Sequence, residues 1–127
     1  MKYLLDTCAF LWFVEDNPRL SADARAILSD DDNVMGVSII TFWEMAIKSS
    51  IGKLTLPASL RDMQNAASVE AIEIVPVTVA TTEILMTLPF HHTDPFDRSI
   101  IATAIDGGWI VLTPDALYDG YAVKRLW

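Results

Sequence analysis

In His91-His92-Thr93-Asp94-Pro95-Phe96-Asp97-Arg98-Ser99-Ile100-Ile101-Ala102-Thr103-Ala104, the start of a helix and two carboxylates lie within a few residues of one another. Pro95 has a fixed φ that suits the first helical position, so we expect Asp94 at the N-cap, where its side chain can accept a backbone N–H. Asp97 then falls in the first turn, near the positive end of the helix dipole. An apolar stripe at helical spacing follows and predicts a buried helix over residues 95–105, with Asp97 at its top.

Short apolar runs alternate with helical patterns along the rest of the chain. Strands are predicted at residues 2–5, 34–37, 72–77 and 109–112, with a last short strand within 122–127. Further helices are predicted at residues 8–14, 22–28, 39–50, 57–68 and 79–86. Strands separated by helices are typical of βαβ units, so we expect an α/β fold with a parallel sheet. The 127 residues contain no linker or repeat and predict one domain over residues 1–127.

The composition is apolar for a chain of this size. Apolar residues make up 52 % of the chain and the mean hydropathy is +0.33, which indicates apolar surface covered by a partner or a second copy. No apolar run approaches the ~20 residues that a membrane-spanning helix needs. Without a signal-peptide pattern, and with Cys8 as the one cysteine, the sequence predicts a cytoplasmic protein with no internal disulfide.

The net charge is strongly negative. A formal value of −8 argues against binding nucleic acid through a basic surface. It fits a protein that gathers carboxylates to hold cations, or one with a basic partner. The acidic run Asp30-Asp31-Asp32 is interpreted as a solvated loop rather than as a metal site.

Four other acids fall where a parallel sheet places its ligands, beyond the carboxyl ends of the strands. Asp6 follows the first strand, Asp115 follows the fourth, Asp97 begins a helix, and Glu44 lies two turns into the helix after the second strand. Four crowded carboxylates repel one another unless protons or cations offset their charge. Mg²⁺ and Mn²⁺ take carboxylate oxygens, can polarise a phosphoryl oxygen and can acidify a water molecule. The set is therefore typical of metal-dependent nucleases and phosphatases.

Each acid also has a simpler interpretation when it is taken alone. Asp94 is explained by helix capping, Asp115 by the dipole of a following helix, and Glu44 by a surface ion pair with Lys48 one turn later. Asp6 is harder to explain in this way, because a charged residue directly after a buried strand usually has a specific task. The four acids taken together therefore indicate a metal-dependent site more specifically than any one of them does alone.

Histidine and aromatic residues suggest two further kinds of site, and the sequence disfavours both. A zinc site takes about four nitrogen or sulfur ligands, whereas the chain has two histidines, His91 and His92, and one cysteine. We expect the histidines to have a loop role near the helix cap. The aromatic residues in two adjacent pairs are interpreted as core or interface rather than as a base-stacking platform. They are Trp12, Phe13, Phe42 and Trp43.

Four blocks in this order resemble the PIN-domain (PilT N-terminus) family, in the branch of VapC-like toxins of bacterial toxin–antitoxin pairs. They are Leu4-Leu5-Asp6-Thr7; Trp43-Glu44-Met45-Ala46-Ile47-Lys48 with Gly52-Lys53-Leu54; His92-Thr93-Asp94-Pro95-Phe96-Asp97-Arg98 with Ile101-Ala102; and Leu112-Thr113-Pro114-Asp115. The second and third blocks are specific, and the four together span nearly the whole chain.

This resemblance implies a three-layer α/β/α fold and a ribonuclease that uses Mg²⁺, with Mn²⁺ as a substitute. The acidic set would be Asp6, Glu44, Asp97 and Asp115. Asp6 and Asp97 match the positions most often ascribed to direct metal binding, and Asp115 and Glu44 would complete the coordination or orient water. Thr113 matches a hydroxyl residue that helps to hold the site, and Asp94 would be the helix cap or a supporting group.

The resemblance also implies partners for this chain. These are an RNA substrate, a second copy of the chain in a homodimer, and an antitoxin that lays a helix or an extended segment over the site. Basic side chains that could touch RNA phosphates are Lys48, Lys53 and Arg98, with Lys124 and Arg125 near the end of the chain.

Two alternatives are kept beside the ribonuclease. One is a catalytically silent PIN-like interaction domain, which has no need to retain four acids. The other is a phosphoryl-transfer domain with an acidic metal pocket. A receiver domain needs an Asp after the middle strand, where this chain has Gly36-Val37-Ser38, and a haloacid-dehalogenase-type phosphatase needs an Asp at the position of Cys8.

Overall fold

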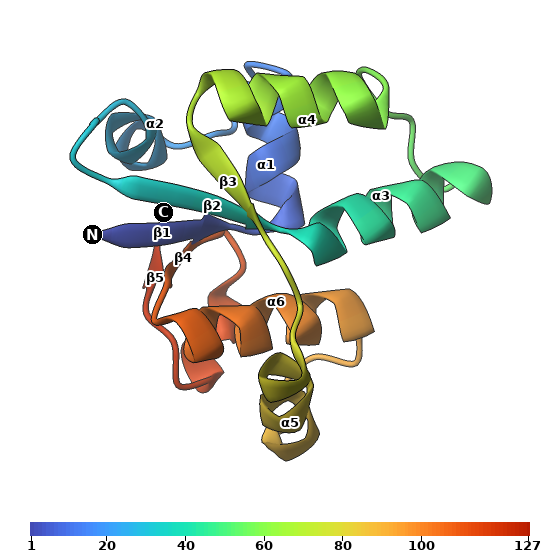
Figure 1. The fold of residues 1–127 in the computed structure, drawn as a ribbon, viewed down its shortest axis with the longest axis vertical. Helices are drawn as coiled ribbons and strands as arrows, with labels where there is room; N and C mark the ends of the chain where they lie inside the picture. Colours follow the sequence, from blue (N-terminus) through green and yellow to red (C-terminus); the bar gives the residue numbers. More distant parts are fainter.

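A five-stranded parallel sheet forms the centre of the computed structural model, which describes residues 1–127 (Figure 1). The strands are β1 (Lys2–Leu5), β2 (Val34–Ser38), β3 (Ile72–Val75), β4 (Ile110–Leu112) and β5 (Arg125–Leu126), in the order β3-β2-β1-β4-β5. All four strand pairs are parallel. The order reverses at β1, since β2 and β3 lie on one side of it and β4 and β5 on the other. Ligands of such sheets bind at the carboxyl ends of the strands beside this reversal.

Helices cover both faces of the sheet and give three layers, which confirms the expected α/β fold (Figure 1). The helices are α1 (Thr7–Val14), α2 (Ala22–Leu28), α3 (Ile39–Ser50), α4 (Leu60–Val69), α5 (Val79–Thr87) and α6 (Pro95–Gly107), followed by a 3₁₀ helix at Ala116–Gly120. In Figure 1, α1, α2 and α4 lie on one side of the sheet, α5 and α6 lie on the other, and α3 extends from the end of β2. No helix combines the length and the apolar character needed to cross a membrane.

Alternate side chains of β1 supply the two hydrophobic cores, as expected of a strand that is covered on both faces. Tyr3 and Leu5 pack in the core with Phe10 of α1, whereas Leu4 packs in the other core with Ile101 of α6. The acidic residue that follows β1 therefore stands at the end of a strand that is buried on both faces.

The start of α6 agrees with its sequence signature. Asp94 is the N-cap and accepts a hydrogen bond from Phe96 N at 2.8 Å, Pro95 is the first helical residue, and Gly108 ends the helix in the left-handed conformation with φ 67°. The next turn contains Arg98, which is buried and donates from its guanidinium to the carbonyl oxygens of Pro89, Leu88 and Leu85. Arg98 thereby caps the C-terminus of α5.

Two expected helix starts were wrong, for local reasons. The helix predicted from Pro57 begins at Leu60, because Ser59 supplies the cap by accepting from Asp62 N at 3.0 Å. The order Thr113-Pro114 repeats the cap-then-proline order of Asp94-Pro95 and predicts a cap at Thr113, but the observed cap is Asp115, two residues later, which accepts from Leu117 N at 3.0 Å.

The expected strand ends also differ slightly from the structure. The strand predicted over 72–77 ends at Val75, because Pro76 has no N–H to donate to the sheet. The strand predicted over 109–112 begins one residue later, at Ile110, and the expected last strand is β5.

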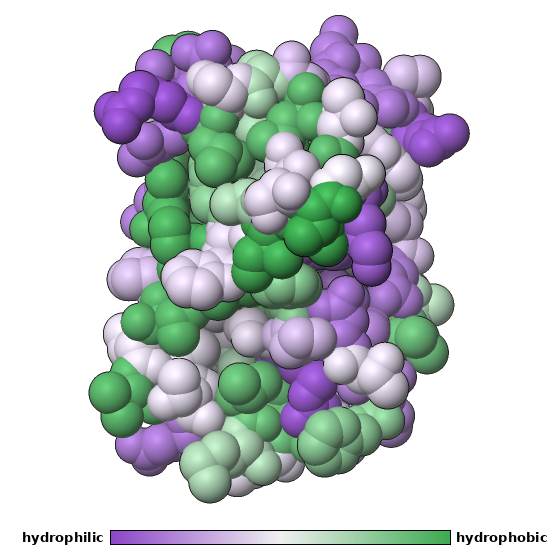
Figure 2. Space-filling model, turned by 90° about the vertical axis from the view of Figure 1, so that its right-hand side faces the viewer, coloured by the Kyte–Doolittle hydropathy of each residue, from purple (hydrophilic) through white to green (hydrophobic).

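An exposed apolar stripe runs along the outer side of α3. It consists of residues four positions apart, and its largest member, Trp43, is 63 % exposed. The stripe comprises Ile39, Trp43, Ile47 and Ile51. Figure 2 views the molecule from the side toward which α3 extends and shows hydrophobic residues gathered among polar ones on that face. Monomeric proteins seldom leave such a stripe uncovered.

Candidate functional site

Asp6 lies at the junction of β1 and α1, where its carboxylate is bound on both oxygens. Its Oδ1 accepts from Ala9 N at 2.7 Å, which caps α1, and its Oδ2 accepts from Thr113 Oγ1 at 2.5 Å. Thr113 follows β4 directly and is fully buried. The side chain of Asp6 itself is only about 5 % exposed. The hydroxyl of Thr113 therefore links the ends of the two strands that flank the reversal of strand order.

Three of the four predicted acids line one pocket of about 440 Å³. They are Asp6, Glu44 and Asp97, which come from the end of β1, from α3 and from the start of α6. Asp94 and Lys48 line the same pocket. Chain segments far apart in sequence thus bring negative charge to one place, at the sheet edge where ligands of parallel sheets bind.

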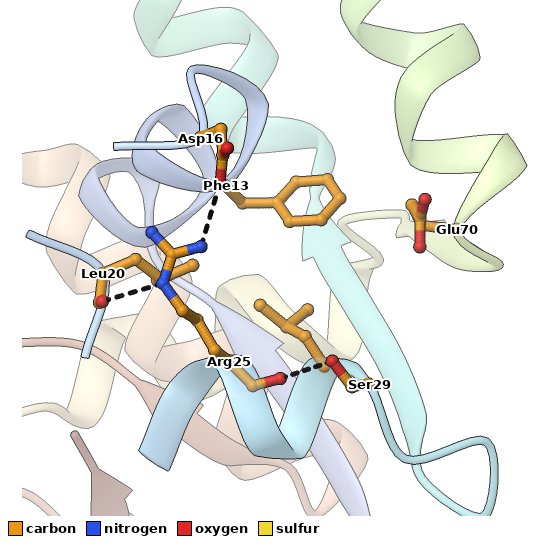
Figure 3. Close-up of a pocket in the computed structure, with 7 residues that line it drawn as sticks. Phe13, Asp16, Leu20, Arg25, Ser29 and Glu70 are labelled. Atoms are coloured by element: carbon orange, nitrogen blue, oxygen red, sulfur yellow. Dashed lines mark hydrogen bonds and ion pairs between the residues drawn. The ribbon is translucent and has the colours of Figure 1, made fainter. Parts of the chain in front are cut away.

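A second pocket, of about 260 Å³, lies between α1, α2 and the end of α4 and has a different character (Figure 3). Its charged residue Arg25 pairs with Asp16 and donates to the backbone oxygens of Leu20 and Asn17. These bonds give the Arg25 guanidinium a structural role, and no group of acids converges in this second pocket. The acidic pocket is therefore the better candidate for chemistry.

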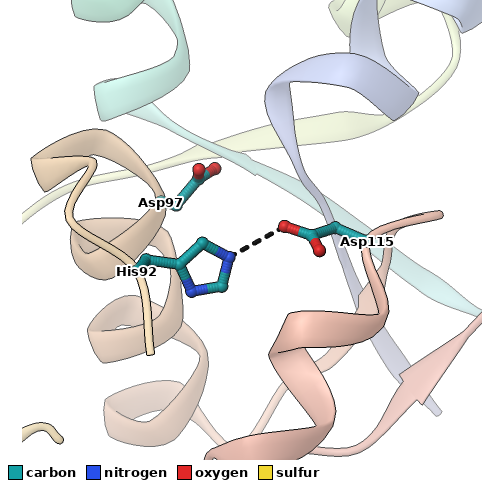
Figure 4. Close-up of side chains that lie close together, drawn as sticks. All are labelled: His92, Asp97 and Asp115. Atoms are coloured by element: carbon teal, nitrogen blue, oxygen red, sulfur yellow. Dashed lines mark hydrogen bonds and ion pairs between the residues drawn. The ribbon is translucent and has the colours of Figure 1, made fainter. Parts of the chain in front are cut away.

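Asp115, the fourth predicted acid, does not line the acidic pocket but lies next to it. Its Oδ2 lies 2.8 Å from His92 Nε2, and both side chains gather with Asp97 (Figure 4). One potential ligand atom from each of His92, Asp97 and Asp115 lies within 4.8 Å of the other two. Asp97 thus belongs both to the pocket and to this cluster, and it connects Asp115 with the other acids.

Burial raises the pKa of two of the acids. The pKa of Asp6 rises from its ordinary value of 3.8 to about 7, mainly because the carboxylate is removed from water and also because Asp97 and Asp115 are close. The pKa of Asp97 rises to about 6, through burial first and then through the charge of Asp94. Such carboxylates take up protons unless a cation offsets them. The close carboxylate oxygens of Asp97 and Asp115 fit a hard divalent cation such as Mg²⁺ or Mn²⁺.

Glu44 is held by two partners inside the pocket. Its Oε1 accepts from Thr7 Oγ1 at 2.6 Å, and its Oε2 forms an ion pair with Lys48. The predicted pair with Lys48 therefore exists, but Glu44 itself is buried. Glu44, followed by Asp94 and Asp97, raises the pKa of Lys48, so the ammonium carries its charge beside the acidic pocket.

Asp94 has a capping role that explains its presence without any metal. Since any short acceptor serves at an N-cap, we expect Asp94→Ser to keep the free energy of unfolding within a few tenths of a kcal/mol, whereas Asp94→Ala should lose ~1 kcal/mol. Denaturation midpoints of the two variants measure this difference. The ribonuclease activity that the sequence resemblance implies should survive in Asp94→Ser; an inactive Asp94→Ser of normal stability would instead place the Asp94 charge in the catalytic set.

The basic candidates for RNA contact separate into two groups. Lys48 lines the acidic pocket, and Lys53 and Lys124 are exposed. Arg98 is buried and its guanidinium holds the end of α5, so it lies too deep to reach a phosphate on the surface. Arg125 pairs with Asp119. Of Lys48, Lys53 and Arg98, the two lysines are therefore better placed to contact an RNA phosphate.

Sequence reasoning missed three residues around the acids. His92, expected in a loop role, is buried against Asp115, and Tyr121 holds its other side. Tyr118 is buried and donates its hydroxyl to Asp97 Oδ1 at 3.2 Å. The one local signal that could have placed His92 near the acids is its position two residues before the Asp94 cap. The tyrosines carry no local signal, because they reach the site from a separate segment.

The core position expected of the aromatic residues is confirmed for two of the four. Phe13 and Phe42 pack against a hydrophobic core, and Trp43 is exposed on α3. Trp12 packs against Trp127 with ring centroids 5.6 Å apart and also lines the acidic pocket.

Comparison with known proteins agrees with this geometry. A family model described as PIN domain matches residues 3–124. The chain is 32 % identical over 114 residues to Ribonuclease VapC22 of Mycobacterium tuberculosis, an alignment that covers 88 % of this chain and 85 % of that protein.

Solved structures share the fold at low sequence identity. VapBC2 from Rickettsia felis, bound to a promoter DNA fragment, matches with a TM-score of 0.71 and 15 % identity over 99 % of this chain and 98 % of that chain. VapBC-1 from nontypeable Haemophilus influenzae matches with a TM-score of 0.69 and 17 % identity over 99 % and 97 % of the two chains. The acidic pocket, the family match and the VapC22 relative lead to one conclusion: this chain belongs to the PIN domain family.

Proposed function

We propose that residues 1–127 form a single PIN domain that acts as a metal-dependent endoribonuclease, the toxin of a type II toxin–antitoxin pair in the cytoplasm. The observation that carries the proposal is the pocket that Asp6, Glu44 and Asp97 line, together with Asp115, which lies close to Asp97. The relative with 32 % identity is named a ribonuclease, and the structures that share the fold include toxin–antitoxin complexes.

In this proposal Asp6, Asp97 and Asp115 hold Mg²⁺, for which Mn²⁺ substitutes. When bound, the cation offsets the charge of a phosphodiester and makes a water molecule more acidic. Thr113 fixes the orientation of the Asp6 carboxylate through its hydrogen bond to Oδ2. The Tyr118 hydroxyl does the same for Asp97. Their support matters because carboxylates that ligate a metal are oriented by such hydrogen bonds.

Glu44 and Lys48 act together on the RNA side of the pocket. Thr7 and Lys48 bind the two oxygens of the Glu44 carboxylate, which supports a role in holding the ammonium in place. Orienting a water molecule is the second role that this proposal gives to Glu44. Lys48 then attracts a phosphate oxygen of the RNA, and the exposed Lys53 contributes positive charge in the turn that follows α3. Lys48 supplies local positive charge to a chain whose formal net charge is −8.

The proposed protein partners are a second copy of the chain and an antitoxin. The exposed stripe of Ile39, Trp43, Ile47 and Ile51 on α3 supports a covered surface of this kind. Sedimentation or light scattering of the protein with and without its antitoxin measures both associations.

The decisive experiment is RNA cleavage by the purified protein in millimolar Mg²⁺. We expect cleavage that stops with a chelator, returns with added Mg²⁺ or Mn²⁺, and is absent from the Asp97→Asn variant purified in the same way. A protein that binds its partners but leaves RNA intact would instead be the silent interaction domain. Equal cleavage by Asp97→Asn would indicate a contaminating nuclease and would contradict the assigned site.

A further inference from the structure

The Tyr121 hydroxyl is surrounded by three hydrogen-bonding groups. Its oxygen accepts from the backbone N–H of His91 at 3.0 Å and from the backbone N–H of His92 at 2.8 Å. These two bonds use the acceptor capacity of a phenolic oxygen. The hydroxyl proton then has one remaining neighbour, the Nδ1 atom of His92 at 3.2 Å. Tyr121 is buried, as is His92.

This arrangement determines which nitrogen of His92 carries hydrogen. Because Nδ1 accepts from Tyr121, the ring proton must lie on Nε2. The Nε2–H group lies 2.8 Å from Asp115 Oδ2 and donates to it. The other oxygen of Asp115, Oδ1, accepts from Leu117 N at 3.0 Å. Both oxygens of Asp115 are thus fixed, one by its own helix and one by His92.

We infer that Tyr121 fixes His92 as its Nε2–H tautomer, which makes His92 a positioning residue for Asp115 and keeps its ring nitrogen from binding the metal. The tautomer follows from the hydrogen bonds alone. The consequence for the metal rests on the proposed function, since it takes Asp115 as a ligand.

Direct binding of a metal by His92 is the competing arrangement, because His92, Asp97 and Asp115 are close enough to share an ion. A metal on Nε2 requires the ring proton on Nδ1, where it needs an acceptor. The neighbour of Nδ1 is the Tyr121 oxygen, which already accepts two N–H groups. Tyr121 therefore opposes this arrangement.

The same constraint bears on which metal the site prefers. A histidine nitrogen beside carboxylates favours zinc and its neighbours in the transition series, whereas carboxylate oxygens alone suit Mg²⁺ and Mn²⁺. With His92 held as a donor, Asp6, Asp97 and Asp115 offer oxygen only. Tyr121, which lies outside the acidic set, thus acts on metal selectivity through the histidine ring.

The tautomer can be read directly by ¹H–¹⁵N correlation of the histidine rings in metal-free protein. The chain has two histidines, so the exposed His91 is assigned by its loss in His91→Gln. We expect His92 to show the Nε2–H pattern, to keep it after Mg²⁺ or Zn²⁺ is added, and to become a mixture of tautomers in Tyr121→Phe. An Nδ1–H pattern in the unmodified protein, or loss of the Nε2 proton when either metal is added, overturns the inference.

The positioning role is tested by Mn²⁺ affinity in calorimetry, without any activity measurement. His92→Leu removes the donor and should weaken Mn²⁺ binding about tenfold or more. His92→Gln offers an amide N–H toward Asp115 and should recover most of the affinity, with His91→Gln unchanged. An equal loss of Mn²⁺ affinity in His92→Gln and His92→Leu would refute the donor role of His92. Tyr121→Phe, a smaller change, provides a second measurement if His92→Leu fails to fold.

The outcomes also separate this inference from the proposed function. Normal Mn²⁺ binding and the Nε2–H pattern without RNA cleavage would reject the ribonuclease and leave the inference standing. A protein that binds no Mn²⁺ would overturn the role of His92 toward the metal, and the tautomer would still be decided by the ring spectra.

Discussion

Asp6→Asn is expected to abolish RNA cleavage and, at the same time, to make the metal-free protein more stable. The buried carboxylate has its pKa raised from 3.8 to about 7, so its contribution to stability is fully present below pH 3.8 and is lost as the pH rises toward 7. At pH 8 the ionised group opposes folding. Asparagine has no charge, keeps an oxygen for Ala9 N and should raise the free energy of unfolding by on the order of 2 kcal/mol.

Activity should move in the opposite direction, because the amide cannot supply the charge that holds the cation. We expect cleavage to fall by at least about 100-fold. Thermal unfolding in a chelator at pH 8 and at pH 5 measures the stability gain, which should shrink at the lower pH, where Asp6 is protonated. Asp23→Asn, an exposed aspartate in the first turn of α2, is the matched control and should change neither property much. An active Asp6→Asn, or one less stable at pH 8, would contradict the assignment.

Millimolar Mg²⁺ or Mn²⁺ should raise the melting temperature of the unmodified protein. An ion that binds the folded acidic site and not the unfolded chain stabilises the fold by mass action, by about 2.7 kcal/mol at 100 times its dissociation constant. Melting curves recorded against metal concentration measure this effect. Asp97→Asn removes one ligand and should abolish most of the rise.

The acidic run Asp30-Asp31-Asp32 provides an internal control for this rise. It lies in the turn between α2 and β2, at the amino end of β2, whereas the acidic pocket lies beyond the carboxyl ends of the strands, and its three side chains are exposed. Substituting all three with asparagine should leave the metal-induced rise intact. If this triple change removed the rise and Asp97→Asn did not, the metal site would be elsewhere.

Local signals in the sequence were enough to predict the start of α6 and the general fold. The capping of Asp94, the position of Pro95 and the placement of Asp97 all depend on residues within one turn, so spacing alone determines them. The alternation of apolar strands and helices likewise predicted the parallel sheet. The helix start at Leu60 was missed because Pro57 and Ser59 both favour a start, and the tertiary structure selects the serine cap.

Contacts between distant segments could not be predicted in this way. The bond between His92 and Asp115 joins residues 23 apart, and the bond from the His92 backbone to Tyr121 joins residues 29 apart. Arg98 follows Asp97 directly and was expected to face RNA, but the next helical position turns it toward the end of α5. Its burial depends on where α5 packs, and spacing along the chain carries no information about that.

The double use of Asp6 has an evolutionary consequence if the protein is a toxin. An asparagine at this position still caps α1, so one nucleotide change in an aspartate codon gives a folded and inactive protein. Cells that lose the antitoxin should therefore carry such escape variants, since a single base change removes the activity while the fold survives.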